Sequence, residues 1–169
     1  VLYHDYEWCV PNYDDRYLFE MLILESFQAG LSWECILNKR VAFREAYDDF
    51  DIDVVSNYDS NKIDSLLNNE NIIRNKLKIQ ASINNAKIFK KIVSEYGSFY
   101  NYLSIFTNNK IVYEINLTKS NLSDNISRDL KKRGMKFVGS TIIYSYLQAI
   151  GIIYSHDREC FMYKKVTDD

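Results

Sequence analysis

The sequence predicts an all-α fold, a helical bundle in a single domain over residues 1–169. Three observations predict it. Apolar side chains recur at a spacing of 3.6 residues in several segments, and glycines or capping residues stand at the ends of those segments. The only proline, Pro11, lies near the N-terminus, and no repeat or low-complexity linker divides the chain. A chain of 169 residues is long enough to bury one sizeable core.

The first half of the chain contains four predicted helices. The first covers residues 18–29, an almost unbroken apolar run that Gly30 ends. A second helix begins with a capping serine and covers residues 32–47. Shorter helices are expected after Asp53 and Ser60.

The longest predicted helix covers residues 76–96, where apolar side chains keep a helical spacing until Gly97 stops it. A shorter, aromatic-rich helix follows over residues 98–106. Residues 107–122 are ambiguous, because their short alternation of apolar and polar side chains fits either an extended segment or a loop. A helix capped by Ser123 comes next and ends in a basic run.

A short hairpin between two helices is predicted after that basic run. Gly139 allows an approach to the backbone that a side chain would block, and the amides of Ser140 and Thr141 begin the next helix. Such amides can donate to a phosphate, with Arg133 and Lys136 close enough to neutralise its charge. The pattern predicts a helix-hairpin-helix element. An ordinary helical hairpin has the same spacing, and the local basic charge favours contact with a DNA backbone.

Glu25 is the most unusual residue of the first helix, because it shares a helix face with the apolar residues Met21, Leu22 and Ala29. A lone buried carboxylate costs several kcal/mol unless it is paired or neutralised. One interpretation is that Glu25 reaches solvent or pairs with Arg40 or Arg44. The other is that the following turn brings Leu31 and Trp33 beside it, which would form a pocket for a flat polar ring.

Composition excludes several classes of protein. The net charge is −2 and the pI is about 5.7, which argues against a protein that coats polyanions indiscriminately. The basic residues are instead grouped, and the groups are Arg74, Lys76 and Lys78, then Lys87, Lys90 and Lys91, then Lys131, Lys132, Arg133 and Lys136. No segment is long and apolar enough to cross a membrane, and no signal-peptide pattern is present. Three cysteines are too few for a disulfide framework, so we expect a cytoplasmic protein. Because the sequence begins with Val1, we expect the natural start to lie upstream.

Several uncommon motifs, taken in order, resemble the type I DNA-3-methyladenine glycosylases of the helix-hairpin-helix superfamily. They are Tyr3-His4-Asp5 with Glu7-Trp8, Leu24-Glu25 with residues 28–33, Ile72-Ile73-Arg74, residues 130–134 with 136–139, and His156 with Cys160. The resemblance implies a monomeric repair enzyme that acts on alkylated double-stranded DNA. It would hydrolyse the N-glycosidic bond of 3-methyladenine, release the free base and leave an abasic site, without lyase activity.

The resemblance also assigns roles to individual residues. Glu25 would hydrogen-bond the excised base. The excised base would also contact Tyr3, Trp8 and Trp33, which line the pocket. Gly30 and Leu31 would contact DNA, and Leu31 would enter the gap in the duplex. Aromatic walls and a carboxylate suit a flipped base that carries positive charge, as 3-methyladenine does in DNA. Since that base is already a good leaving group, a strong catalytic acid is not required.

A structural zinc site is the remaining expectation. His156 and Cys160 are four residues apart, a spacing that lets both reach one zinc ion, although a surface histidine with an inert thiol has the same pattern. The resemblance implies that His4 joins them and that the zinc fastens the two ends of the chain. Three ligands match and the fourth, a cysteine upstream, is missing from this chain. Cys9 is an imperfect substitute for it.

The chain departs from the family pattern at Asn71 and Leu77, where the family tends to have glycines, so the local turn is expected to differ. Two other functions remain open at this point. One is a noncatalytic helix-hairpin-helix module that binds DNA or recognises lesions, and the other is a helical, zinc-stabilised interaction protein. Glu25 with its aromatic partners distinguishes a glycosylase from both alternatives, because a simple binding protein needs no carboxylate in an apolar pocket.

Overall fold

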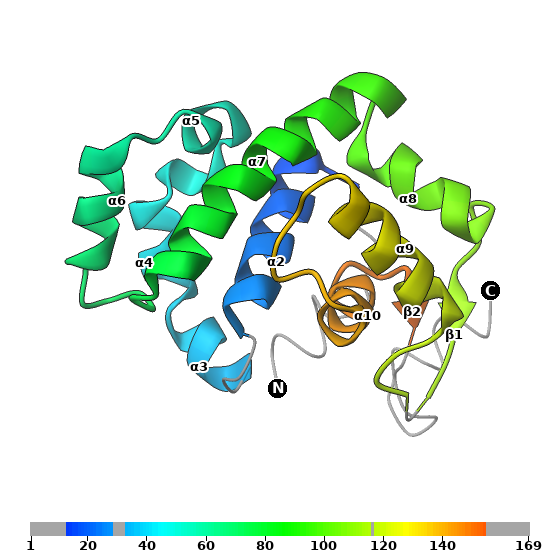
Figure 1. Cartoon of the computed structure of the whole chain (residues 1–169). Coiled ribbons are helices and arrows are strands. Elements are labelled where there is room, and N and C mark those ends of the chain that lie inside the picture. The colour runs from blue at the N-terminus through cyan, green and yellow to red at the C-terminus, as the bar shows by residue number, and fades with distance from the viewer. Residues whose placement is uncertain (1–12, 29–32, 116, 155–169) are drawn as a thin grey trace.

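Helix α2 (Asp15–Gln28) lies at the centre of the fold. Ten consecutive residues, from Leu18 to Phe27, are buried, because other helices contact α2 on every side. The computed structural model describes residues 13–28, 33–115 and 117–154. Within them α7 crosses α2, with α3–α6 on one side of this pair and α8–α10 on the other (Figure 1).

The described residues form a mostly helical fold, as the sequence predicts. After α2 the elements are α3 (Trp33–Asn38), α4 (Arg40–Ala46), the 3₁₀ helix η1 (Asp48–Phe50), α5 (Ile52–Ser56), α6 (Ser60–Leu67), α7 (Lys76–Tyr96), α8 (Phe99–Thr107), β1 (Val112–Tyr113), α9 (Asn121–Lys132), α10 (Ser140–Ala149) and β2 (Ile153–Tyr154). None of the helices in these ranges has the length and apolar character that a membrane span requires.

Local capping explains why the boundaries of α7 and α8 agree with the predictions. The Asn75 side chain accepts a hydrogen bond from the Lys78 amide at the start of α7, and Gly97 ends the helix with a φ of 88°. Ser98 then caps α8 by accepting from the amide of Asn101. Each of these signals lies within a few residues of the boundary that it sets.

Two predicted helices differ from the structure. The helix expected over residues 32–47 is interrupted at Lys39, whose φ of −103° and ψ of 1° lie outside the helical region, so α3 and α4 are separate helices. The helix expected to have Ser123 as its N-cap is capped three residues earlier, so α9 begins at Asn121. Ser120 is its N-cap, and the side chains of Ser120 and Ser123 each accept from the other's amide in a capping box.

The expected all-α fold is corrected in one place by a small parallel sheet. The ambiguous segment 107–122 contains β1, which pairs with β2 in the register Val112 to Ile153 and Tyr113 to Tyr154. The two strands are about forty residues apart, and α9 and α10 connect them. A local pattern of alternation cannot reveal a partner at that distance, so the extended alternative was correct but could not be decided from the sequence.

Candidate functional site

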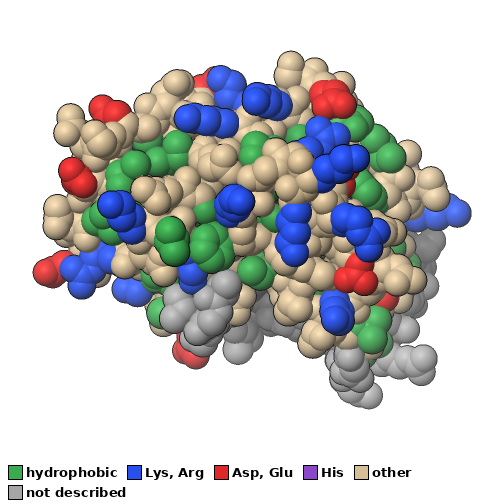
Figure 2. Space-filling model, in the orientation of Figure 1, with side chains coloured by type: hydrophobic (Ala, Val, Ile, Leu, Met, Phe, Trp, Pro, Cys, Tyr) green, Lys and Arg blue, Asp and Glu red, His purple; other side chains and the backbone are tan. Residues whose placement is uncertain are grey.

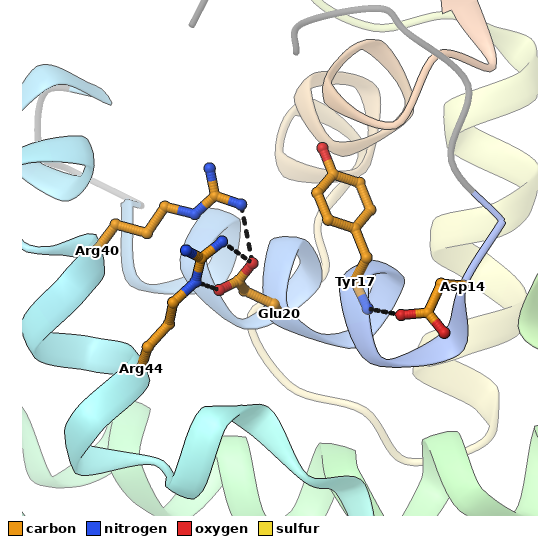
Figure 3. Close-up of polar contacts among 5 residues, drawn as sticks. All are labelled: Asp14, Tyr17, Glu20, Arg40 and Arg44. Carbon is orange, nitrogen blue, oxygen red and sulfur yellow. Dashed lines mark hydrogen bonds and ion pairs between the residues drawn. The ribbon is translucent and has the colours of Figure 1, made fainter.

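Two buried carboxylates on α2, Glu20 and Glu25, lie in opposite environments. Glu20 accepts hydrogen bonds from Arg40 Nη2 at 2.8 Å and Arg44 Nη2 at 3.0 Å, and from Arg44 Nε (Figure 3). Burial opposes ionisation of Glu20, but the hydrogen bonds from Arg44 and Arg40 outweigh it and lower the pKa of this carboxyl. Glu20 is therefore an ionised partner of the two arginines, and its role is to attach α4 to α2.

Glu25 forms no ion pair with a cation in the part of the chain that the structure describes. Its side chain is buried, with 3% of the residue exposed, and burial raises its pKa from 4.5 to about 8. Its Oε2 atom has no hydrogen-bond partner among the residues that the structure describes. The two ordinary interpretations of Glu25 are therefore wrong, because it does not reach solvent and because Arg40 and Arg44 bind Glu20 instead. A buried acid that the fold leaves unsatisfied is a candidate for ligand binding.

The last turn of α2, which carries Glu25, is held by two other elements. Lys78 of α7 donates from Nζ to the carbonyl of Phe27 at 2.9 Å, so a cation lies at the negative end of the α2 dipole. Ser26 donates to the carbonyl of Phe137 at 3.1 Å in the loop between α9 and α10. Lys78 belongs to the first basic group of the sequence, yet it is 9% exposed and its charge is used in this contact.

The loop between α9 and α10 contains the predicted contacts to a DNA backbone. Arg133, which ends α9, is engaged within the protein: its guanidinium binds Asp129 at 2.8 Å, Glu95 at 3.0 Å and the Tyr96 hydroxyl at 3.0 Å. Lys136 is exposed. Of the two side chains expected to neutralise a phosphate, Lys136 is thus the one whose charge faces solvent.

The start of α10 is open to a partner. Gly139 is its N-cap and supplies no side-chain hydrogen bond, while the Ser140 hydroxyl donates to Asp124 and lies 2.8 Å from Ser123 Oγ. A Cβ added to Gly139 would meet no described atom within 4 Å, and its φ of −60° suits any residue. Neither crowding nor backbone conformation therefore requires glycine here. The amides of Ser140 and Thr141 are available because the first amides of a helix have no partner within the helix.

Basic side chains gather around this loop. Figure 2 shows lysine and arginine over the face on which α7 and α9 lie, with acidic side chains mostly at its edges. The exposed basic residues of these elements and of the loop are Lys76, Lys87, Lys90, Lys91, Arg128, Lys131, Lys132 and Lys136. Lys90 forms a 2.9 Å ion pair with Asp53, whereas Lys87 and Lys91 follow Asn84 at helical spacing and so share the face of α7 that contacts the loop. Leu77, in the first turn of α7, is 69% exposed beside this face.

Several predicted site residues lie outside the described residues. They are Tyr3, His4, Trp8, Gly30, Leu31, His156 and Cys160, and the side chain of Trp33 belongs with them although its backbone begins α3. Over residues 13–28, 33–115 and 117–154, no group of three or more His, Cys, Asp or Glu side chains is placed to hold a metal ion. The predicted zinc ligands therefore remain a prediction.

A family model described as methyladenine glycosylase matches residues 1–163. The chain belongs to the methyladenine glycosylase family. DNA-3-methyladenine glycosylase 1 of Escherichia coli (strain K12) is 38% identical to it, over 96% of this chain and 90% of that protein. The DNA-3-methyladenine glycosylase of Haemophilus influenzae is 36% identical, over 94% of this chain and 89% of that protein. The resemblance of the sequence motifs to DNA-3-methyladenine glycosylases is thus confirmed at the level of the family.

Solved structures agree with this family of methyladenine glycosylases. A variant of 3-methyladenine DNA glycosylase I in complex with 3-methyladenine has a TM-score of 0.90 and 36% identity, covering 94% of this chain and 88% of that one. The enzyme from Staphylococcus aureus, solved to explain 3-methyladenine recognition, gives the same score and identity over 94% and 87%. Within this methyladenine glycosylase, Glu25 is the one residue of the predicted base pocket whose side chain is described.

Proposed function

We propose that this methyladenine glycosylase acts as a monomer on alkylated double-stranded DNA and hydrolyses the N-glycosidic bond of 3-methyladenine. The products are the free base and an abasic site, with no cleavage of the strand. The observation that carries the proposal is Glu25, a buried acid with no cation partner among residues 13–28, 33–115 and 117–154, in a member of this family. Relatives named for this activity, which span most of the chain, support it.

The proposed role of Glu25 follows from its environment. With a pKa of about 8, Glu25 is mostly protonated at neutral pH in the free protein. A flipped 3-methyladenine nucleotide carries a positive charge, which favours the ionised form of a nearby carboxyl. Binding of the lesion therefore stabilises the carboxylate and releases a proton, whereas uncharged adenine gains no such attraction. Glu25 selects a base that is already a good leaving group.

The proposed contact with the DNA backbone is the loop between α9 and α10, which we interpret as a helix-hairpin-helix element. Its support is the open start of α10 at Gly139, the exposed Lys136 and the basic residues around it. Backbone amides at a helix start attract a phosphate through both hydrogen bonding and the helix dipole. The loop would hold the duplex while Glu25 reads the flipped base.

The first experiment is an assay of base release. Methylated duplex DNA is incubated with the full chain, and we expect free 3-methyladenine to be released, with strand breaks that appear only after alkaline treatment. Tight binding of the duplex by folded protein with no released base would instead support the noncatalytic DNA-binding module. Strand cleavage without alkali would contradict the absence of lyase activity.

Replacing Gly139 with alanine tests the proposed phosphate contact. We expect the free energy of unfolding to change by less than about 1 kcal/mol, because the new methyl group meets open space. Affinity for duplex DNA should fall roughly tenfold, since the methyl group stands where a phosphate would approach. Gly97→Ala is the matched control: its φ of 88° makes the variant less stable, but DNA affinity of the folded protein should not change. Unchanged DNA affinity in the Gly139→Ala variant would contradict the proposed phosphate contact.

We also propose a structural zinc ion held by His4, His156 and Cys160. The spacing of His156 and Cys160 supports it, and the family resemblance implies His4 as the third ligand. When bound, zinc would supply cross-linking of the two ends of the chain and no catalytic step. Protein purified without chelators should contain zinc by elemental analysis, and His156→Ala should reduce that content and lower the Tm. Absence of zinc from folded wild-type protein would contradict the proposal.

A further inference from the structure

Asn85 of α7 makes a paired contact with the backbone of the loop between α9 and α10. Its Nδ2 donates to the carbonyl of Lys136 at 2.8 Å, and its Oδ1 accepts from the amide of Lys136 at 3.0 Å. The residue is fully buried. The preceding residue, Asn84, donates from its side chain to the carbonyl of Gly134 at 2.9 Å. Figure 1 shows this loop lying alongside α7.

The same loop is fastened to α2, next to the predicted base pocket. Ser26 follows Glu25 directly, and its hydroxyl shares one proton between the carbonyl of Leu22 at 2.9 Å in the same helix and the carbonyl of Phe137 at 3.1 Å. Phe137 has a φ of 56°, a conformation that is strained for a bulky residue and persists only where surrounding contacts enforce it. Asn85 and Ser26 bind consecutive residues of the loop and so enforce that conformation from two helices.

Burial of an amide on a helix face is expensive unless every polar atom finds a partner. An apolar residue at position 85 could be buried in the core without this desolvation cost, as Ile79, Ala86 and Ile92 of the same helix are. The side-chain amide of Asn85 instead both donates to and accepts from the backbone of one loop residue, and its oxygen also accepts from Asn84 at 3.4 Å. That residue is Lys136, whose side chain is exposed for a phosphate contact. Asn85 therefore determines where this lysine and the start of α10 lie relative to Glu25.

We propose that Asn85 is a positioning residue for the excision reaction. By fixing the backbone at Lys136, it sets the distance between the phosphate contact of the loop and the base pocket at Glu25, so that one duplex can engage both. The proposal rests on the proposed function and extends it. Asn85 touches neither the base nor the phosphate, and it acts through the loop.

The test compares Asn85→Ala with Ser82→Ala. Ser82 is also buried on α7, but it bonds the Tyr47 hydroxyl at 3.0 Å, away from the loop, so its loss perturbs α7 without releasing Lys136. Steady-state excision is measured on a duplex with one 3-methyladenine, and binding of free 3-methyladenine is followed by intrinsic fluorescence. For Asn85→Ala we expect KM for duplex to rise on the order of tenfold, with kcat and free-base Kd within about twofold of wild type. For Ser82→Ala all three constants should stay within about twofold.

The proposal is overturned if Asn85→Ala gives the same KM as Ser82→Ala, or if free-base affinity falls in parallel with KM. Should Asn85→Ala not fold, Asn84→Ala decides, because it removes one partly exposed contact to the same loop. Its KM should rise about threefold, and an unchanged KM overturns the proposal. If wild-type protein releases no base, the proposed activity fails separately. Affinity for an abasic-site duplex, measured by fluorescence anisotropy, then replaces KM for the same variants.

Discussion

Glu25→Gln is expected to make the protein more stable above pH 7. In the wild type, burial raises the pKa of Glu25 from 4.5 to about 8, so the fold opposes ionisation of this side chain. Each pKa unit corresponds to about 1.4 kcal/mol, which gives a cost of about 4 kcal/mol at pH 8 and about 5 kcal/mol well above it. Glutamine has the same shape and no charge, but its buried amide costs about 1–3 kcal/mol. The net gain at pH 8 should be about 2 kcal/mol.

The pH dependence of the stability difference shows whether Glu25 causes the lower stability of the wild type. A carboxyl whose pKa is raised in the folded state binds more protons there than in the unfolded state, so stability falls as pH rises from about 4.5 to about 8 and then levels. The variant lacks this fall. Urea unfolding of both proteins at pH 5, 6, 7 and 8 should give a difference that grows with pH, and other titrating groups cancel in that difference. Parallel curves would show that Glu25 is not buried as an isolated acid.

The same substitution should impair excision. The amide cannot acquire the negative charge that a cationic base favours, so kcat/KM for 3-methyladenine in duplex should fall about a hundredfold, or about 2.7 kcal/mol. A protein that gains stability while losing activity would place Glu25 in the group of residues kept for function at the expense of the fold. Unchanged excision would mean that another residue reads the base.

The sequence predicted the helices whose signals are local. Capping residues and Gly97 define α7 and α8, and the apolar run defines α2. The interruption at Lys39 was not predictable in this way, because no side-chain cap marks it. The pairing of β1 with β2 was not predictable either, because it joins segments that are distant in the sequence. Local pattern therefore gives the type of an element more reliably than its partner.

The candidate site was predictable to the same extent. Helical spacing indicated that Glu25 lies on an apolar face. Spacing within one helix does not say which acid, Glu20 or Glu25, binds the arginines of α4. The contacts of Ser26, Lys78 and Asn85 were missed. A polar residue on the apolar face of a long helix was a signal for Asn85, yet its partner, 51 residues away, is visible only in the fold.

Glu20→Ala should produce the largest loss of stability, about 3–5 kcal/mol at pH 7, because it removes the carboxylate of a buried ion pair and leaves the charge of Arg40 in place. The Arg40 side chain is 11% exposed, so water cannot replace the lost carboxylate fully. The matched control is Lys90→Ala, which breaks the exposed pair with Asp53 and should cost no more than about 1 kcal/mol. Urea unfolding measures both, and similar losses would show that burial does not strengthen the Glu20 contacts.

The pH dependence of the Glu20 contribution is opposite to that of Glu25. Because arginine contacts lower the pKa of Glu20 in the folded state, its contribution is complete above the ordinary value of 4.5 and is lost as pH falls through the folded value. The difference in stability between wild type and Glu20→Ala should therefore be constant from pH 8 to 5 and shrink only in acid. Over that same range the Glu25→Gln difference changes most. The effects of these two carboxylates, five residues apart on one helix, can therefore be separated by pH. Glu20 stabilises the contact of α4 with α2, whereas Glu25 lowers stability, and only a cationic ligand restores it.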